Sequence, residues 1–406
     1  MDDHNHHTGQ PRGPERMSRR AILTAGAGLA ATQIIPGGTA GAQEPKKDPP
    51  AAKGPFPARA YAAPKADAPL GPLKIERRGV GPHDVLLDVL YCGVCHSDIH
   101  QARDEWAEWG PTTYPCVPGH EIIGRVAAVG EKVTKFKVGD VGGVGCMVDS
   151  CRTCDPCRSD REQNCEKGAT FTYNAPDKHG PAKVTYGGYS DKIVATEHFV
   201  IRIPPGADLA ATAPLLCAGI TTFSPMQHWK LKGGQKVGVI GLGGLGHLAV
   251  KLAVARKADV TVFTTSPGKV KDAVRLGAKD AVLSTDADAM KRLANTFDLL
   301  ISTAPKAYPM GPFVNALKAG GTLVNVGAME ELKGVTGINL IYARKSVAGS
   351  MIGGIAETQE VIDYCAARGI TADVELIAPE DINKAFDRVV KKDVRYRFVI
   401  DMAKLK

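Results

Sequence analysis

Four cysteines in one loop have the spacing of a closed metal site. The pattern is Cys151-x2-Cys154-x2-Cys157-x7-Cys165. Four thiolates can surround a Zn²⁺ ion tetrahedrally and leave no position for a substrate, so a site of this kind supports the fold. An iron–sulfur cluster is the alternative, because the first three cysteines also match the start of the bacterial ferredoxin run. That run continues with x3-Cys-Pro, which this sequence lacks, and the spacing therefore favours structural zinc.

A glycine cluster predicts a dinucleotide-binding turn. Gly241, Gly243 and Gly246 fit G-x-G-x-x-G, after an apolar run at 236–240 and at the start of a helical stretch at 245–255. In this motif the first glycine allows a tight turn, the second lets the backbone approach a pyrophosphate, and the third lets helix and strand pack closely. Gly244 and Leu245 would stand at the helix N-terminus, where free N–H groups and the helix dipole attract phosphate.

The residues at the end of the second predicted strand indicate NADP rather than NAD. An acidic residue about 20 positions beyond the glycines would bind the ribose 2′-hydroxyl of NAD. No carboxylate stands there, since Asp259 is at the wrong end of the strand and the strand is followed by Thr264, Thr265, Ser266 and Lys269. Three hydroxyls and a cation suit a 2′-phosphate through hydrogen bonds and charge. A polar turn without a ligand is the alternative.

The elements that would carry these residues are of two kinds. Residues 61–192 hold short alternating runs between Gly and Pro turns, such as 85–90 and 122–129, and predict a β-rich domain. Beyond Gly233, strands and helices alternate, which predicts a parallel, doubly wound sheet and an α/β fold class. The expected strands are 236–240, 260–263, 281–283, 297–301 and 322–326, with helices at 245–255 and 269–276. Two helical stretches (358–368 and 379–391) and a strand (397–400) follow.

Cys95, His120 and Cys217 are three further candidate metal ligands, dispersed along the chain. Taken singly, each could be a core residue, but the segments around them (93–100, 119–121 and 215–221) resemble the zinc-dependent medium-chain alcohol dehydrogenases. Within that family the chain looks most similar to the cinnamyl-alcohol-dehydrogenase-like branch, whose members reduce aldehydes with NADPH. The resemblance runs from about Leu73 to Asp401 and includes the four-cysteine loop, the glycine motif and segments 137–140, 349–353 and 395–401.

The resemblance implies a domain organisation. A β-rich, GroES-like catalytic domain is expected at 61–218, with a Rossmann NADP-binding domain inserted at 219–353 and a C-terminal return to the catalytic domain at 354–406. It also implies an open zinc site, because two thiolates and one imidazole leave a fourth position for water or a substrate oxygen, whose pKa the ion would lower. Two zinc ions per chain are therefore expected.

Further site residues follow from the same resemblance. Ser97 is expected to contact the substrate oxygen, and His100 to complete a proton relay, for which an unperturbed pKa of about 6.5 is suitable. Asp98 is expected to orient His120, and Glu121 to approach the zinc during ligand exchange. Thr221 and Arg397 match positions near the nicotinamide and the pyrophosphate. The substrate pocket is expected to use Trp106 and Met351, with Trp109 as a weaker candidate.

The predicted activity is hydride transfer between NADP(H) and a small primary alcohol or aldehyde of the medium-chain or aromatic type, by an expected homodimer. A zinc-free quinone reductase of the same superfamily and a zinc-ribbon protein that binds nucleic acid are the alternatives. The chain has 406 residues, with 44% hydrophobic and 23% charged residues, which excludes a mainly disordered or fibrous protein. Its net charge of +8 is weak support for nucleic-acid binding, and no apolar run reaches the ~20 residues of a membrane span.

The first 42 residues have the layout of a signal peptide. Residues 1–17 are polar, Arg19 and Arg20 precede an apolar stretch at 21–35, and Ala40-Gly41-Ala42 supplies small residues for cleavage. The arginine pair resembles the bacterial twin-arginine type, which carries folded proteins. We therefore expect a periplasmic or secreted protein, cytoplasmic if the leader is not used. Residues 43–60, rich in Pro, Lys and Ala, are expected to form a linker.

Replacement of both arginines by lysine tests this leader. The double variant Arg19→Lys, Arg20→Lys should remain in the cytoplasm as the unprocessed precursor, because the export route reads the arginine pair. Wild-type protein should instead begin near Gln43, as N-terminal sequencing of the exported fraction would show. Unchanged fractionation of the double variant would mean that the arginine pair has no role.

Overall fold

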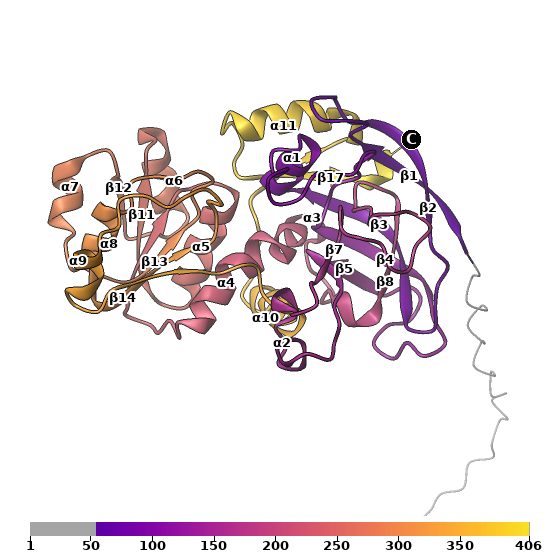
Figure 1. Ribbon diagram of the computed structural model, residues 1–406, viewed down its shortest axis with the longest axis horizontal. Coiled ribbons are helices and arrows are strands. Elements are labelled where there is room, and N and C mark those ends of the chain that lie inside the picture. Colours follow the sequence, from indigo (N-terminus) through magenta and orange to yellow (C-terminus); the bar gives the residue numbers. More distant parts are fainter. Residues whose placement is uncertain (1–53, 406) are drawn as a thin grey trace, which may run out of the picture. The chain divides into compact units, whose positions relative to one another are not determined.

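The computed structural model describes residues 54–405. The predicted leader, and most of the predicted linker, lie outside these residues. Two large sheets dominate the described part, one mostly antiparallel and one parallel. The predicted α/β fold class, with a doubly wound sheet and a β-rich part, is therefore confirmed (Figure 1).

The seven-stranded sheet has the order β16-β17-β3-β4-β5-β9, with β8 also paired to β3. Its strands are β3 (Asp84–Val94), β4 (Ile122–Val129), β5 (Val141–Val144), β8 (Lys192–Thr196), β9 (Val200–Arg202), β16 (Val374–Ile377) and β17 (Arg397–Asp401). The C-terminal strand β17 pairs antiparallel with β3, with Phe398 opposite Val94. Figure 1 shows the yellow β17 beside the indigo β3. β16 and β17 thus join the sheet formed by β3, β4, β5, β8 and β9, from which the parallel sheet separates them in the sequence.

The predicted linker is wrong at its C-terminal end. Residues 56–60 belong to β1 (Phe56–Ala62), which pairs antiparallel with β2 (Gly71–Arg77). Alternate residues Ala58, Ala60 and Ala62 are buried, so this stretch has the period of a half-buried strand despite its linker-like composition.

Short elements fill the rest of this part of the chain. The four cysteines lie around β6 (Met147–Asp149), α2 (Asp155–Arg158), η1 (Glu162–Asn164) and β7 (Thr170–Phe171). Elsewhere are α1 (His96–Ala102), η2 (Glu197–Phe199), α3 (Leu209–Thr212), η3 (Ala213–Leu216), η5 (Pro379–Asp381), α11 (Ile382–Val390) and η6 (Met402–Lys404).

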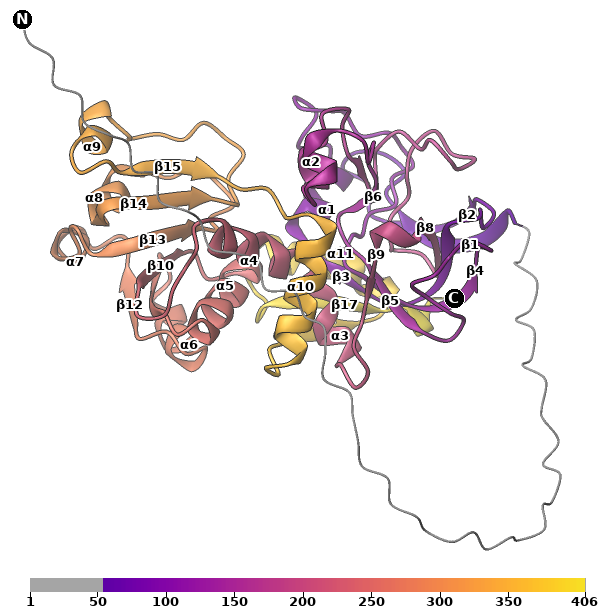
Figure 2. The same cartoon turned by 90° about the horizontal axis from the view of Figure 1, so that it is seen from below.

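The six-stranded sheet is parallel throughout and has the order β12-β11-β10-β13-β14-β15. Its strands are β10 (Lys236–Ile240), β11 (Asp259–Thr264), β12 (Asp280–Leu283), β13 (Phe297–Ser302), β14 (Leu317–Asn325) and β15 (Ser346–Gly349). Figure 2 shows β13, β14 and β15 as neighbouring arrows. The order reverses at β10, so the carboxyl ends of β10 and β13 flank the position where such sheets bind ligands.

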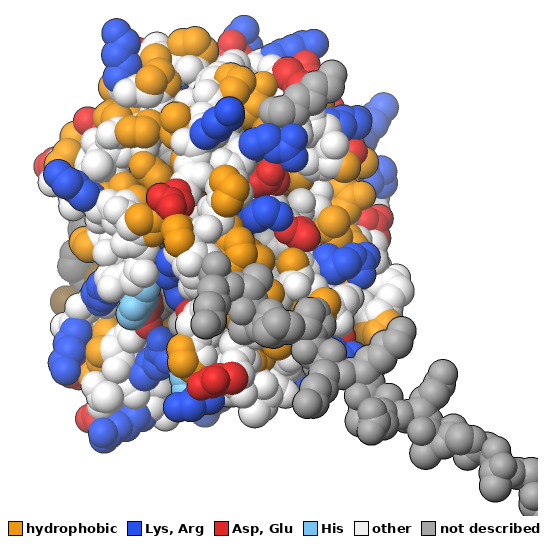
Figure 3. Space-filling view, turned by 90° about the vertical axis from the view of Figure 1, so that its right-hand side faces the viewer, with side chains coloured by type: hydrophobic (Ala, Val, Ile, Leu, Met, Phe, Trp, Pro, Cys, Tyr) orange, Lys and Arg blue, Asp and Glu red, His pale blue; other side chains and the backbone are white. Residues whose placement is uncertain are grey.

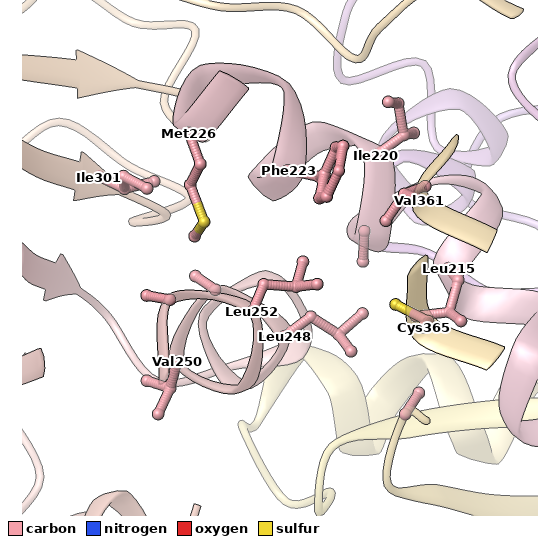
Figure 4. Packing of buried hydrophobic residues seen from close by; sticks show 14 of the residues in the cluster. Leu215, Ile220, Phe223, Met226, Leu248, Val250, Leu252, Ile301, Val361 and Cys365 are labelled. Atoms are coloured by element: carbon pink, nitrogen blue, oxygen red, sulfur yellow. The ribbon is translucent and has the colours of Figure 1, made fainter. Parts of the chain in front are cut away.

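Helices connect and cover these strands. They are α4 (Ala218–His228), α5 (Gly244–Ala255), η4 (Pro267–Lys269), α6 (Val270–Arg275), α7 (Ala287–Arg292), α8 (Gly311–Ala316), α9 (Gly337–Ile341) and α10 (Ile355–Ala366). Figure 4 shows how Phe223 and Met226 of α4 face Leu248 and Leu252 of α5, with Val361 of α10 beside them. This apolar packing fixes α5, whose N-terminus carries the glycine motif.

Among residues 54–405, no single helix is long and apolar enough to cross a membrane. One pair of consecutive helices reaches that length and composition together, Leu209–Leu216 and Ala218–His228, whose axes bend by 53° at the break between them. Most residues of this pair are buried inside the protein.

A buried histidine lies near the start of α5. His247 is fully buried, and its ring stacks on Tyr396 at a centroid distance of 4.9 Å. Burial, and then the charge of Lys251, lower the pKa of His247 from 6.5 to about 4, although Asp373 opposes the shift. The folded protein therefore holds this imidazole neutral where an unfolded chain would protonate it.

Stability should fall with acidity through this residue. Because the pKa of His247 is lower in the folded state, the unfolded chain binds the extra proton between pH 6.5 and 4, and the free energy of unfolding decreases by up to about 3 kcal/mol over that interval. The His247→Gln variant, which has no titrating group at this position, should lose less stability than wild type over the same pH interval. Denaturant titrations of both proteins at several pH values measure the difference, and parallel curves would contradict the prediction.

Candidate metal centre and dinucleotide site

Four predicted residues from separate parts of the sequence meet in one buried cluster. One ligand atom each from Cys95, His120, Glu121 and Cys217 lies within 4.8 Å of the others. Cys95 follows β3 and caps α1, His120 and Glu121 precede β4, and Cys217 begins α4. Three chain segments therefore have to fold together before the cluster exists.

Asp98 fixes the backbone around two of these ligands. Its Oδ2 accepts hydrogen bonds from the Cys95 N–H at 2.8 Å and the Tyr189 hydroxyl at 2.9 Å, and its Oδ1 accepts from the Gly119 N–H at 3.1 Å. The sequence predicts that Asp98 orients His120. The carboxylate binds the backbone on both sides of the cluster, at Cys95 and at Gly119, the residue before His120. Its orientation of the His120 ring stays a prediction.

The donor set of the cluster fits zinc. The Sγ atoms of Cys95 and Cys217 lie 3.9 Å apart, and two sulfurs bound tetrahedrally to zinc at about 2.3 Å would be about 3.8 Å apart. The contact with Cys217 lowers the pKa of the Cys95 thiol well below its ordinary value. Nε2 of His120 is buried and has no hydrogen-bond partner, as expected of an atom that ligates a metal.

Arg397 connects this cluster with the glycine turn. Its NH2 group donates to Oε1 of Glu121, and both side chains are almost completely buried. A Cβ atom placed on Gly244 would lie 2.7 Å from Cδ and NH1 of Arg397, so the arginine side chain runs against the turn. Nε of Arg397 and Oε2 of Glu121 are buried and have no hydrogen-bond partner among the described residues.

The predicted relay residues lie on α1. Ser97 Oγ is 3.6 Å from Cys95 Sγ, and His100 follows one helical turn later. Nδ1 of His100 lies 2.5 Å from Oε2 of Glu105, which holds the ring in one orientation. Trp106 stacks on His100 at a centroid distance of 5.0 Å. Trp106, a predicted substrate-pocket residue, therefore lies beside His100, the predicted relay histidine.

The four-cysteine loop forms a second cluster. Cys151, Cys154, Cys157 and Cys165 each place a sulfur within 4.8 Å of the others, and Cys151 Sγ is 3.9 Å from Cys157 Sγ. Hydrogen bonds from Thr153 and from the N–H of Cys154 lower the pKa of Cys151 to about 5. Backbone N–H donors thus stabilise the thiolate form that a metal requires.

The glycine turn has the geometry that the motif predicts. Gly241 adopts φ +93°, which favours glycine, and a Cβ on Gly246 would collide with the Gly241 carbonyl. A Cβ on Gly243 would meet no atom within 4 Å, so this backbone faces open space where a pyrophosphate can approach. Leu245 is half-buried in the first turn of α5.

Lys269 reaches the same turn from the end of the second strand. Its Nζ donates to the Leu242 carbonyl at 2.8 Å, and burial, followed by repulsion from Arg395 and Lys392, lowers its pKa. Thr264 is buried and accepts a hydrogen bond from the Ser266 N–H, whereas Thr265 is exposed. The predicted cation therefore stands beside the glycine turn, at the end of the strand where the 2′-phosphate is expected.

Other predicted residues are less closely connected to the site. Thr221 is buried in α4, one turn after Cys217, to whose carbonyl its N–H donates at 2.9 Å. Met351 and Trp109 are half-exposed, at 50% and 54%. Their part in a substrate pocket remains a prediction.

Three residues near the cluster escaped the sequence analysis. The ring of Tyr173 stacks on His120 at 5.3 Å, Tyr189 binds Asp98, and Glu105 binds His100. Tyr173 and Tyr189 are more than 50 positions from His120 and carry no motif. Glu105 is only five positions from His100, but that spacing does not put two residues on one helix face.

Comparisons with known proteins agree with this geometry. The family described as "Alcohol dehydrogenase GroES-like domain" matches residues 81–205, and "Zinc-binding dehydrogenase" matches residues 244–367. The NADP-dependent alcohol dehydrogenase C 1 of Mycolicibacterium smegmatis is 51% identical over 348 residues, which are 86% of this chain and 98% of that protein.

Two solved structures have the same fold. A cinnamyl alcohol dehydrogenase from Sorghum bicolor aligns with a TM-score of 0.83 and 43% identity, over 86% of this chain and 99% of that one. A CAD from Helicobacter pylori, complexed with NADP(H), aligns with a TM-score of 0.81 and 41% identity, over 87% and 100%. Similarity of this extent, together with the two thiol clusters and the glycine turn, shows that the chain belongs to the zinc-binding alcohol dehydrogenase family.

Proposed function

We propose that this protein is a zinc-containing, NADP-dependent alcohol dehydrogenase that interconverts small primary alcohols and aldehydes by hydride transfer. The observation that carries the proposal is the connection made by Arg397, which touches Gly244 of the dinucleotide turn and pairs with Glu121 of the ligand cluster. A dinucleotide on that turn would therefore extend toward the cluster. The names of the relatives, which include NADP and cinnamyl alcohol, support the same activity.

Each group of residues has a distinct part in this reaction. Cys95, His120 and Cys217 would hold a zinc ion that polarises the substrate oxygen when bound. Ser97 would exchange a proton with that oxygen, and His100, held by Glu105, would pass the proton toward solvent. Arg397 would neutralise the pyrophosphate. Cys151, Cys154, Cys157 and Cys165 would hold a second zinc ion that only stabilises their loop.

The substrate class and assembly belong to the same proposal. We propose medium-chain or aromatic substrates, supported by the aromatic side chain of Trp106 beside His100 and by the apolar Met351. We also propose a homodimer, and export of the chain through its twin-arginine leader. On the face drawn in Figure 3, basic, acidic and apolar side chains are interspersed, so this face offers no continuous cationic surface for nucleic acid.

A substrate panel tests the activity. The mature protein should oxidise NADPH in the presence of aromatic and medium-chain aldehydes, and reduce NADP in the presence of the corresponding alcohols. Absorbance at the reduced nicotinamide band follows both directions. No turnover with any aldehyde would contradict the proposal, and turnover with quinones alone would favour the quinone reductase.

The two metal sites should respond differently to mutation. Cys95→Ala and Cys217→Ala should abolish turnover and remove one zinc while the melting temperature changes little, because the other cluster residues are held by neighbouring elements. Cys154→Ala should remove the other zinc and lower the melting temperature, because this metal closes a loop with little core of its own. Elemental analysis and thermal unfolding measure both, with the buried Cys365→Ala as a control. Equal loss of stability in both sets would contradict this division.

Cofactor preference should depend on charge at Lys269. A charge-assisted contact to a 2′-phosphate is worth roughly 1.5–3 kcal/mol, so Lys269→Ala should raise the KM for NADPH by about tenfold to hundredfold and leave NADH nearly unchanged. Thr264→Asp should reverse the preference toward NADH, because a carboxylate repels the phosphate and accepts from a ribose hydroxyl. The exposed Lys271→Ala is a matched control. An equal rise in the KM values for NADPH and NADH in Lys269→Ala would show that Lys269 does not bind the 2′-phosphate.

A further inference from the structure

His247 lies between the glycine turn and a distant part of the chain. Its Nδ1 is 3.3 Å from the Gly243 carbonyl, and its Nε2 accepts a hydrogen bond from the Asp373 N–H at 3.3 Å. These two contacts require the neutral tautomer with the proton on Nδ1. The ring edge therefore joins the N-cap of α5 to the segment just before β16.

Asp373 in turn gathers several elements. Its Oδ1 accepts from Lys251 Nζ of α5 at 2.5 Å, and its Oδ2 accepts from Arg275 of α6 at 3.1 Å. Its backbone carbonyl accepts from the N–H groups of Tyr396 at 3.0 Å and Arg397 at 3.1 Å. One residue thus ties both helices beside the glycine turn to the start of β17.

These contacts form a closed circuit around Arg397. His247 binds Gly243, Asp373 binds His247 and the backbone of Arg397, and the Arg397 side chain lies against Gly244. We propose that His247 and Asp373 are positioning residues, which set where the Arg397 guanidinium stands relative to the turn and thereby set the affinity for the dinucleotide pyrophosphate. This inference rests on the proposed function, since it assumes that a dinucleotide binds at the turn.

A role in packing alone would not need this arrangement. The face of the His247 ring is covered by Tyr396, and an apolar side chain of similar size could fill that space. What an apolar side chain cannot supply is an acceptor for the partly buried Asp373 N–H and a donor to the Gly243 carbonyl. The two ring nitrogens of His247 are therefore the atoms that would position the turn.

Three substitutions at one position separate these contacts. His247→Leu removes both, His247→Asn keeps a donor near Gly243, and His247→Gln keeps an acceptor that can reach the Asp373 N–H. His247→Leu and His247→Asn should raise the dissociation constant for NADPH by about tenfold, whereas His247→Gln should stay within about threefold of wild type. Asp373→Asn, which keeps the backbone and loses the ion pairs, should raise it by about threefold. Fluorescence titration with NADPH measures all four.

A second probe distinguishes positioning from general damage. Adenosine 2′-monophosphate carries the 2′-phosphate and the adenine but no pyrophosphate, so its inhibition constant should be the same for wild type and His247→Leu. Lys269→Ala should weaken the binding of NADPH and of adenosine 2′-monophosphate. Zinc content and melting temperature should be measured on the same samples, so that a variant that fails to fold is replaced in the comparison by Asp373→Asn.

The outcomes separate the two proposals. If wild-type protein does not bind NADPH, the proposed function is wrong and the inference falls with it. If wild type binds NADPH and His247→Leu binds it equally well, only the positioning role is wrong. If His247→Leu lowers the affinity for NADPH and for adenosine 2′-monophosphate by the same factor, His247 supports the fold of this region and does not position Arg397. Selective loss of NADPH affinity, restored by His247→Gln, supports the inference.

Discussion

The buried ion pair between Arg397 and Glu121 is the contact on which the rest of the site depends. Two charges removed from water cost several kcal/mol unless they pair with good geometry, so neither residue can be buried here without the other. Glu121 follows the candidate ligand His120, and Arg397 lies against the dinucleotide turn. The pair therefore requires β17 to return to the sheet beside β3, and it requires the turn and the ligand cluster to be adjacent.

The two cysteine-containing clusters differ in how the fold brings their thiols together. Cys151, Cys154, Cys157 and Cys165 lie close together in the sequence, and backbone N–H groups of the same loop stabilise their sulfurs. Cys95 and Cys217 come from segments more than a hundred residues apart and are held by Asp98, Tyr189 and two helix starts. A local cluster can order a loop that has little core. A dispersed cluster needs the fold first, and can then leave one side accessible to a substrate.

The segment from 370 to 397 has a larger role than its motifs indicate. Asp373 binds α5, α6 and the backbone of β17, and His247 connects it to Gly243. Apart from the contact of His247 with Gly243, four positions away, these contacts join residues far apart in sequence. The glycine turn therefore has its local shape from its own residues, whereas its place relative to Arg397 depends on side chains contributed by the end of the chain.

The sequence by itself determined the features that depend on local geometry. The strand and helix around the glycine motif, the roles of Gly241 and Gly246, and the four-cysteine loop follow from short-range spacing, because backbone conformation and ligand reach act over a few residues. Composition misjudged residues 56–60, where the strand is stabilised by pairing with β2 and not by its own residues. Only the tertiary structure decided that Asp98 binds backbone, that Tyr173 covers His120 and that Glu105 holds His100. Contacts of this kind come from side chains that meet after the sheets and helices have packed, and no periodicity or spacing records them.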